Sequence, residues 1–374
     1  MTNNTDIRPF RIEIPEADLA DLRSRIERTR YTGELPGVGG DYGVSVEYVQ
    51  NLVEYWKSGY DWRAAEAKLN SYPQFTTEID GQNIHFLHVR SPEPDATPLI
   101  LTHGWPTTVV EYLDVIGPLT DPRAHGGDPS EAFHLVIPSI PGFGFSGPTS
   151  ERGWNRYRTA KAWAELMRRL GYDQYGAHGN DGGSLISPEV GRFDPEHVIG
   201  VHVTQIFSFP SGDPSELEGL SEEDAGKVRF LQWFYENMGA YDKLQSQAPQ
   251  TLAHALADSP VGQLAWSSQL FGDAVSPDYI LTDVMIYWLT NTAASSARFY
   301  YEDAHATDVP TEPTTFPLGL ANFANDFQSI RPFAERDHKH IVSWNTYDTG
   351  GHFAAHDVPD LLVGDIRAFF RSLR

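Results

Sequence analysis

The segment Tyr175-Gly176-Ala177-His178-Gly179-Asn180-Asp181-Gly182-Gly183-Ser184 reads as the end of a β-strand, a sharp turn and the start of a helix. The turn has the small-x-nucleophile-x-small form of a nucleophile elbow, with Asp181 where that motif usually has serine. Gly179 and Gly183 would let the strand and the helix approach closely around a strained backbone. Because the same residue types also form ordinary surface turns, this segment alone leaves both interpretations open.

An aspartate at the elbow favours a particular kind of chemistry. A serine hydroxyl must lose a proton to a neighbouring base before it attacks. A carboxylate, with an ordinary pKa of about 4, is already ionised at neutral pH. Asp181 therefore suits displacement at a saturated carbon, as in an epoxide or an alkyl halide. The product would be an ester of the protein, which a second step must cleave.

The overall composition excludes several classes of partner. The 374 residues suggest one large domain, or a core with an added module. With 28 basic and 51 acidic residues the net charge is −23, so we expect neither nucleic acid nor an anionic membrane surface as partner. The chain has no cysteine, which excludes disulfides and thiolate-bound metals. Its 9 Trp, 17 Tyr and 20 Phe are consistent with a large apolar pocket.

The sequence contains no recognisable targeting or anchoring segment. Residues 1–5 lack a basic region followed by an apolar stretch, so we expect no signal peptide. No apolar run approaches the roughly 20 residues that span a bilayer. We therefore predict a cytoplasmic protein without a membrane anchor.

The strand pattern predicts an α/β fold with a mostly parallel central sheet. Continuous apolar runs at 98–102, 133–137 and 198–206 are typical of buried parallel strands, and a helix is predicted over 159–170. Ligands of such sheets bind at the carboxyl ends of the strands. From 210 to 305 aromatic-rich and acid-rich helical stretches follow one another, which indicates a helical cap.

The domain prediction has four parts. We expect an N-terminal module over 1–95, the first part of the core over 96–209, the cap over 210–305 and the second part of the core over 306–374. Within the first module we predict a strand over 10–14, and helices from 15, over 46–56 and over 61–69. A hairpin over 75–90 should turn at Asp80-Gly81.

Two loops carry candidates for the remaining chemistry. His103-Gly104-Trp105-Pro106 follows a buried strand, so the Trp105 N–H could join the Gly182 N–H in an oxyanion hole. Gly350-Gly351-His352-Phe353 precedes the last helix, and His352 lies where the base of an elbow protein is found in chain order. His356 is the alternative, but we expect it on a helix face.

The third member should be a carboxylate after a late strand, because an acid must orient the histidine and stabilise its charged form. Chain order modestly favours Asp326, with Asp337, Asp348 and the weaker Glu335 as alternatives. An epoxide substrate would also need a donor for its oxygen, and a neutral phenol could supply it. Spacing alone does not choose among the 17 tyrosines.

Taken together, these motifs resemble the epoxide hydrolases of the α/β-hydrolase fold, in particular the microsomal-type branch with an N-terminal wrap-around module. The resemblance covers nearly the whole chain. The matching segments include the H-G-x-P loop, the P-S-x-P-G-F-G-F-S loop and the G-G-H-F-A-A signature, which here are His103 to Pro106, Pro138 to Ser146 and Gly350 to Ala355.

The resemblance implies a role for each matching position. Asp181 is the nucleophile and His352 the base, and Asp326 in Phe323-Ala324-Asn325-Asp326 is the histidine's partner. Tyr241 and Tyr300 are the epoxide-activating tyrosines, with Tyr301 an adjacent alternative to Tyr300. The chain departs from the family at Gly182, often Trp, and at Asn180 and Ala324. These departures bear on pocket shape more than on the reaction.

We therefore expect an epoxide hydrolase that converts an epoxide, bulky or aryl-bearing, and water into a vicinal diol through an ester on Asp181. No metal or organic cofactor is required. The resemblance also suggests a role in bacterial secondary metabolism such as antibiotic biosynthesis. A haloalkane dehalogenase and a non-catalytic binding protein are the alternatives. The physiological epoxide, its regiochemistry and enantiopreference, and the oligomeric state, with a homodimer as candidate, are left open.

Overall fold

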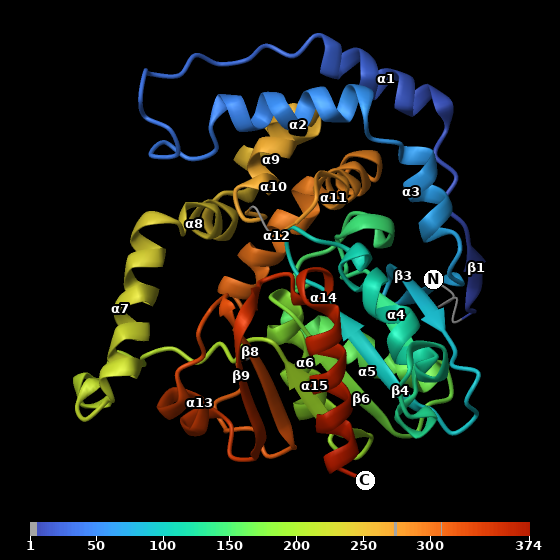
Figure 1. The fold of residues 1–374 in the computed structure, drawn as a ribbon, viewed down its shortest axis with the longest axis vertical. Coiled ribbons are helices and arrows are strands. Elements are labelled where there is room, and N and C mark those ends of the chain that lie inside the picture. The colour runs from blue at the N-terminus through green and yellow to red at the C-terminus, as the bar shows by residue number, and fades with distance from the viewer. Residues whose placement is uncertain (1–5, 273–274, 308) are drawn as a thin grey trace.

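The described strands pair into one nine-stranded sheet, in the order β1-β2-β3-β5-β4-β6-β7-β8-β9. The computed structural model describes residues 6–272, 275–307 and 309–374. Residues 1–5, for which we expect no signal peptide, lie outside this description. Figure 1 shows the sheet in the lower half of the molecule, with the N-terminal helices and much of the cap above it.

The first part of the sheet is antiparallel. It consists of β1 (Arg8–Phe10), β2 (Gln74–Ile79) and β3 (Gln82–Val89), and β3 then pairs antiparallel with β5. The predicted turn at Asp80-Gly81 is confirmed, since both residues have a positive φ, 51° and 75°, as a two-residue hairpin turn requires.

The strand predicted over 10–14 is wrong in its extent. β1 ends at Phe10, and the backbone of the next residues binds side chains instead of a neighbouring strand. The N–H of Ile12 donates to Asn70 Oδ1 at 2.9 Å, and the N–H of Ile14 donates to Glu66 Oε1 at 2.8 Å. The alternating pattern therefore reflects packing along a helix and not pairing in the sheet.

The remaining strands are parallel, and three of them follow the apolar runs predicted at 98–102, 133–137 and 198–206. They are β4 (Thr97–Thr102), β5 (Phe133–Pro138), β6 (Tyr175–Gly179), β7 (Val198–Val203), β8 (Leu318–Asn325) and β9 (Ile341–Gly351). Their carboxyl ends meet at one edge of the sheet, where the elbow after β6 lies.

Helices cover both faces of the sheet, so its central strands are buried on both sides. One face carries α4 (Leu113–Thr120), α14 (Ala354–Asp357) and α15 (Pro359–Ser372), and the other carries α5 (Arg156–Arg169) and α6 (Gly182–Phe193). Alternate residues of β4 accordingly belong to different cores: Leu99 and Leu101 to the first, Ile100 to the second. Short 3₁₀ turns are Val109–Tyr112, Pro122–His125, Pro129–Glu131, Gly144–Ser146 and Pro214–Leu217, and α13 spans Arg331–Asp337.

A run of helices is inserted between β7 and β8, as the sequence predicts. It comprises α7 (Glu222–Asn237), α8 (Ala240–Gln247), α9 (Pro249–Asp258), α10 (Pro260–Ser268), α11 (Pro277–Leu289) and α12 (Ala293–Ala304). None of the residues of α7 is buried, and Figure 1 shows this helix at the margin of the molecule. In contrast, nine residues of α11 are buried.

The N-terminal helices α1 (Glu16–Glu27), α2 (Val46–Ser58) and α3 (Trp62–Leu69) pack against this insertion. Leu19, Leu22 and Ile26 of α1 share a hydrophobic core with residues of α10 and α11. The hydroxyl of Tyr55 donates to Asp278 Oδ1 at 2.8 Å. The module therefore braces the inserted helices against the rest of the chain (Figure 1).

Within the described residues, each helix is too short or too polar to cross a membrane.

Candidate active site

The elbow forms where β6 ends at Gly179 and α6 begins at Gly182. Asp181 between them has φ 51° and ψ −118°, a conformation that few residues other than glycine adopt. The two flanking glycines are required by close packing. A Cβ on Gly179 would lie 2.0 Å from the Gly183 carbonyl oxygen, and one on Gly183 would lie 1.8 Å from that of Thr102. The segment is thus a strained elbow and not an ordinary surface turn.

The loop after β4 contacts the side chain of Asp181. The Trp105 N–H donates to Asp181 Oδ1 at 2.9 Å. A Cβ on Gly104 would lie 2.2 Å from the same oxygen, so glycine is needed for the loop to come this close. Gly182, which lies against Gly104, begins α6, and the first N–H groups of a helix have no partner within it. The structure therefore brings both predicted oxyanion donors to the nucleophile position.

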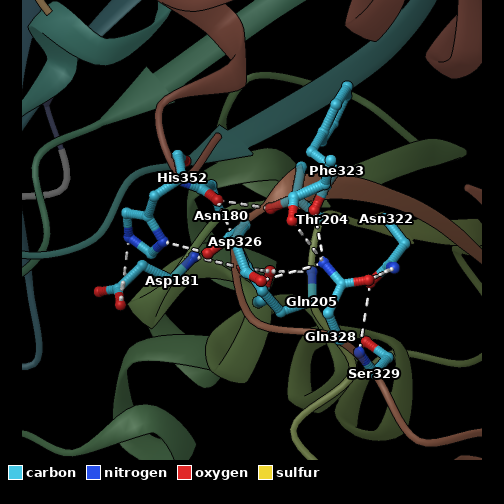
Figure 2. Close-up of polar contacts among 12 residues, drawn as sticks. Asn180, Asp181, Thr204, Gln205, Asn322, Phe323, Asp326, Gln328, Ser329 and His352 are labelled. Atoms are coloured by element: carbon cyan, nitrogen blue, oxygen red, sulfur yellow. Dashed lines mark hydrogen bonds and ion pairs between the residues drawn. The ribbon is translucent and has the colours of Figure 1, made fainter. Parts of the chain in front are cut away.

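His352 lies between the two predicted carboxylates. Its Nδ1 is 2.7 Å from Asp326 Oδ1, and its Nε2 is 3.6 Å from Asp181 Oδ2. Figure 2 shows the three side chains in this order. The Asp326 side chain is only 5 % exposed, whereas those of Asp181 and His352 are 22 % and 25 % exposed. The acid is therefore the most buried of the three side chains.

The competing residues make other contacts. His356 Nδ1 is 2.8 Å from Asp114 Oδ2, Asp337 pairs with Arg336, and Glu335 pairs with Arg331. Asp348 is exposed on β9. The structure thus places Asp326, and not these alternatives, at His352.

The electrostatic surroundings of His352 favour its protonated form. Burial by itself would lower the pKa of the imidazole. The charge of Asp326 and its hydrogen bond, followed by the charges of Asp181 and Glu111, outweigh burial and raise the pKa to about 9. With Asp181 ionised, His352 is an imidazolium at neutral pH.

Two tyrosines of the inserted helices meet at Trp105. The Tyr241 ring stacks on Trp105 with centroids 5.5 Å apart, and the Tyr300 ring meets Trp105 edge-on at 6.1 Å. The ring centroids of Tyr241 and Tyr300 are 6.2 Å apart. Burial, and then the charge of Asp181, raise the pKa of both phenols, so both are neutral donors at ordinary pH. Tyr301 instead is 38 % exposed and stacks on His305.

Sequence reasoning missed several polar residues beneath the site. Thr204 and Gln205 follow β7 and bind Asn180, which the sequence marked only as a departure from the family. Their position at the carboxyl end of a buried strand was a usable signal. Glu111 gave no such signal. It is 1 % exposed and accepts a 2.6 Å hydrogen bond from Thr107 Oγ1, and burial raises its pKa to about 7.

Two cavities lie away from the tyrosines. One of about 470 Å³ lies beside α6 and is lined by Ser184 and Gln205 among others. The second, about 520 Å³, lies between α1 and α10. Neither is lined by Tyr241 or Tyr300, so neither is the large apolar pocket suggested by the many aromatic residues. Among residues 6–272, 275–307 and 309–374, no group of three or more His, Asp or Glu side chains could hold a metal ion.

Comparison with known proteins gives consistent matches along the chain. Residues 7–112 match the family described as the epoxide hydrolase N terminus. A relative in Stigmatella aurantiaca (strain DW4/3-1), whose name assigns it provisionally to the epoxide hydrolases, is 42 % identical over an alignment of 384 positions, which covers 98 % of this chain and 86 % of that protein. Epoxide hydrolase 1 of Sus scrofa is 35 % identical over an alignment of 404 positions, which covers 98 % of this chain and 89 % of the relative.

The fold is also similar to that of a solved structure. The juvenile hormone epoxide hydrolase of the silkworm Bombyx mori superposes with a TM-score of 0.89 at 26 % identity, covering 100 % of this chain and 96 % of that one. These likenesses confirm the predicted α/β-hydrolase fold, with its mostly parallel sheet, N-terminal antiparallel strands and helical insertion.

Proposed function

This chain belongs to the microsomal-type epoxide hydrolases, which convert epoxides into diols, and from that premise we propose that it does so through a covalent ester on Asp181. The observation that carries the proposal is the position of His352, 2.7 Å from Asp326 and 3.6 Å from Asp181. Family membership sets aside the dehalogenase and binding-protein alternatives.

In the first step Asp181 attacks a ring carbon of the epoxide. One carboxylate oxygen forms a bond to that carbon while the bond from the carbon to the epoxide oxygen breaks. The oxygen leaves as a developing alkoxide, and Tyr241 and Tyr300 donate hydrogen bonds to it and supply its proton. Since both phenols are neutral, they can donate without a metal or a charged acid.

In the second step water cleaves the ester. His352 removes a proton from water, and the hydroxide attacks the ester carbonyl carbon of Asp181. The N–H groups of Trp105 and Gly182 stabilise the negative oxygen of the tetrahedral intermediate. The intermediate then releases the diol oxygen, which takes the proton back from His352. The proton left on the Asp181 carboxyl group returns to the tyrosine that protonated the alkoxide, so that Asp181 is restored as a carboxylate and the phenol as a neutral donor. Asp326 holds the imidazole and stabilises its charged form.

The two steps are coupled through the charge of Asp181. The free carboxylate raises the pKa of His352, so the resting enzyme holds an imidazolium. Alkylation converts Asp181 into a neutral ester and removes that contribution. The pKa of His352 then falls, its proton passes to solvent, and the neutral imidazole is available as the base for ester hydrolysis.

We propose that the substrates are bulky or aryl-bearing epoxides. Two groups of aromatic rings are present: Trp105, Tyr241 and Tyr300 contact one another at the nucleophile, and Phe207 and Phe209 pack against Phe327, the residue after Asp326. Aromatic side chains bind flat apolar groups by stacking and edge contacts.

A place in bacterial secondary metabolism, such as antibiotic biosynthesis, belongs to the same proposal and depends on the sequence resemblance. A cytoplasmic location and a homodimer stay predictions.

The test is diol formation from a panel of epoxides that spans small aliphatic, long aliphatic and aryl-bearing members. We expect turnover of several members, with the highest kcat/KM for the aryl-bearing ones. Equal or higher kcat/KM for the small aliphatic epoxides would overturn the proposed substrate class. Diol formation by the Asp181→Asn variant at a rate close to that of the unchanged enzyme would overturn the proposed route.

A further inference from the structure

Gln205 lies directly beneath the proposed catalytic groups and has no assigned role. It follows β7, is fully buried, and uses both ends of its side-chain amide. We propose that Gln205 is a positioning residue that holds the nucleophile elbow and the Asp326 carboxylate in a fixed relation. This inference rests on the function proposed above.

The oxygen of the amide binds the elbow. Gln205 Oε1 accepts the backbone N–H of Asp181 at 2.8 Å and the hydroxyl of Ser184 at 2.8 Å. Asp181 has a positive φ and cannot hold this conformation by its own preference. A fixed acceptor for its N–H therefore stabilises the conformation that presents the carboxylate to the substrate.

The nitrogen of the amide binds the acid. Gln205 Nε2 donates to Asp326 Oδ2 and, at 2.7 Å, to Asn180 Oδ1. Asp326 Oδ1 is the oxygen that faces His352 Nδ1. The two oxygens of Asp326 are thus divided between His352 and Gln205, which fixes the plane of the carboxylate.

This arrangement also fixes the orientation of the amide. An amide has two donor hydrogens and one oxygen with two lone pairs, and here all are used. The Asp181 N–H requires an oxygen on one side, and the Asp326 carboxylate requires a donor on the other. A rotated amide would place like groups against each other on both sides.

Asn180 extends the contact to the loop that carries the base. Its Nδ2 donates to the His352 carbonyl oxygen at 2.9 Å, while its Oδ1 accepts from Gln205 and from Thr204 Oγ1. Figure 2 shows Gln205 at the centre of these contacts, between Asp181, Asn180 and Asp326. Gln205 therefore links the segments that carry the nucleophile and the acid directly, and the segment that carries the base through Asn180.

Two substitutions separate a positioning role from a structural one. Gln205→Met keeps the length of the side chain but leaves the Asp181 N–H and one Asp326 oxygen unpaired in a buried place. Gln205→Glu keeps the shape. When protonated it can still donate to Asp326, but once ionised it places a second negative charge there. Burial and the Asp326 charge raise the pKa of such a carboxyl above its ordinary value.

The experiment uses the full-length enzyme in single turnovers with styrene oxide between pH 5 and 9. Mass spectrometry of the quenched protein follows formation and loss of the ester. We expect Gln205→Met to slow ester hydrolysis by about ten- to hundredfold at every pH, the cost of a small misplacement of reacting groups. Gln205→Glu should keep a hydrolysis rate close to that of the unchanged enzyme at low pH and lose it progressively as pH rises.

Gln328→Met is the matched control. Gln328 lies on the loop that carries Asp326, but its amide nitrogen donates to the carbonyl oxygens of Phe323 and Asp326 and not to a carboxylate. We expect this change to lower the melting temperature without altering the pH dependence of ester hydrolysis.

Two results would overturn the positioning role: a normal hydrolysis rate in Gln205→Met, or a Gln205→Glu rate that stays in constant ratio to that of the unchanged enzyme across the pH range. If Gln205→Met fails to fold, Gln205→Glu decides alone. Failure of the proposed function is distinguishable, because the unchanged enzyme itself would then form no ester on Asp181.

Discussion

The two sides of the active site are held in place by different forces. On the core side, hydrogen bonds join Asp181 to the Trp105 N–H and to the Gln205 side chain, and join His352 to Asp326. On the cap side, Tyr241 and Tyr300 are held against Trp105 by ring contacts of 5.5 and 6.1 Å.

This difference separates the reaction from the choice of substrate. A network of hydrogen bonds fixes distances and angles, because each bond weakens steeply when it is bent. Ring contacts are favourable over a range of offsets, so they tolerate small shifts. The core side is thus suited to the chemical steps that all epoxide substrates share. The cap side can bind the epoxide oxygen of substrates that differ in shape. Substitutions on the two sides should therefore affect different steps.

The largest effect is expected for Asp181→Asn. An amide is a poor nucleophile, so no ester should form, and turnover should fall on the order of 10⁴-fold or more. Intact-protein mass after mixing with styrene oxide measures this directly. Asp348→Asn, which changes an exposed carboxylate, should leave ester formation normal. An adduct of normal amount on the Asp181→Asn variant would contradict the assignment.

The next effect is expected for His352→Gln, which should stop the second step and spare the first. The ester should form and then persist, with hydrolysis slowed on the order of 10³- to 10⁴-fold. Time-resolved mass spectrometry would show the accumulated adduct. His356→Gln is the control, because His356 contacts Asp114 instead. Loss of ester formation itself in His352→Gln would argue against a role confined to hydrolysis.

On the cap side, Tyr241→Phe and Tyr300→Phe should each slow ester formation by about 10²-fold, since each removes one donor to the epoxide oxygen. Hydrolysis of the ester, once formed, should change little. Tyr301→Phe is the matched control because that ring is exposed and faces His305. A larger effect on ester hydrolysis than on ester formation would contradict the claim that the two tyrosines act in the first step.

A smaller effect is expected in the titration of His352. The negative charge of Asp181 stabilises the imidazolium and so raises the pKa of His352, which is about 9 in the free enzyme. Removing that charge should lower the pKa. Nitrogen-15 NMR of the histidine in the unchanged enzyme and in Asp181→Asn measures the difference, and hydrolysis of the ester should rise with pH up to that lowered pKa. An equal pKa in the two proteins would refute the coupling of the steps.

The smallest effect is expected at the margin of the cap. Phe230 and Trp233 on α7 are 52 % and 50 % exposed, and no residue of that helix is buried. Phe230→Ser and Trp233→Ser should therefore change the free energy of unfolding by no more than about 0.5 kcal/mol. Denaturant unfolding measures this, and a change of several kcal/mol would show that α7 supports the fold.

The elements that could be predicted from the sequence are those with a local sequence signature. The apolar runs of β4, β5 and β7 and the Asp80-Gly81 turn have local signatures, and Asp181 and His352 lie in glycine-rich motifs. The strand predicted over 10–14 failed because its partner is a helix end brought near by tertiary packing.

The end of a buried strand points to Gln205 as a residue near the site, but its partners could not be predicted from the sequence, for a similar reason. Gln205 is an ordinary glutamine until β6, β7 and the loop after β8 lie side by side, since its partners are 24 and 121 residues away. Likewise, composition indicates many aromatic residues, but only the fold shows that Tyr300, and not Tyr301, meets Tyr241.

The most direct test of the covalent route is a single turnover of excess enzyme with styrene oxide in ¹⁸O-water, followed by mass analysis of the diol and of the peptide that contains Asp181. Because water attacks the ester carbonyl, we predict one ¹⁸O in the Asp181 carboxylate and none in the diol of the first turnover. Label in that first diol, with an unlabelled peptide, would contradict the account. Water would then attack the epoxide itself, and Asp181 would act as a base.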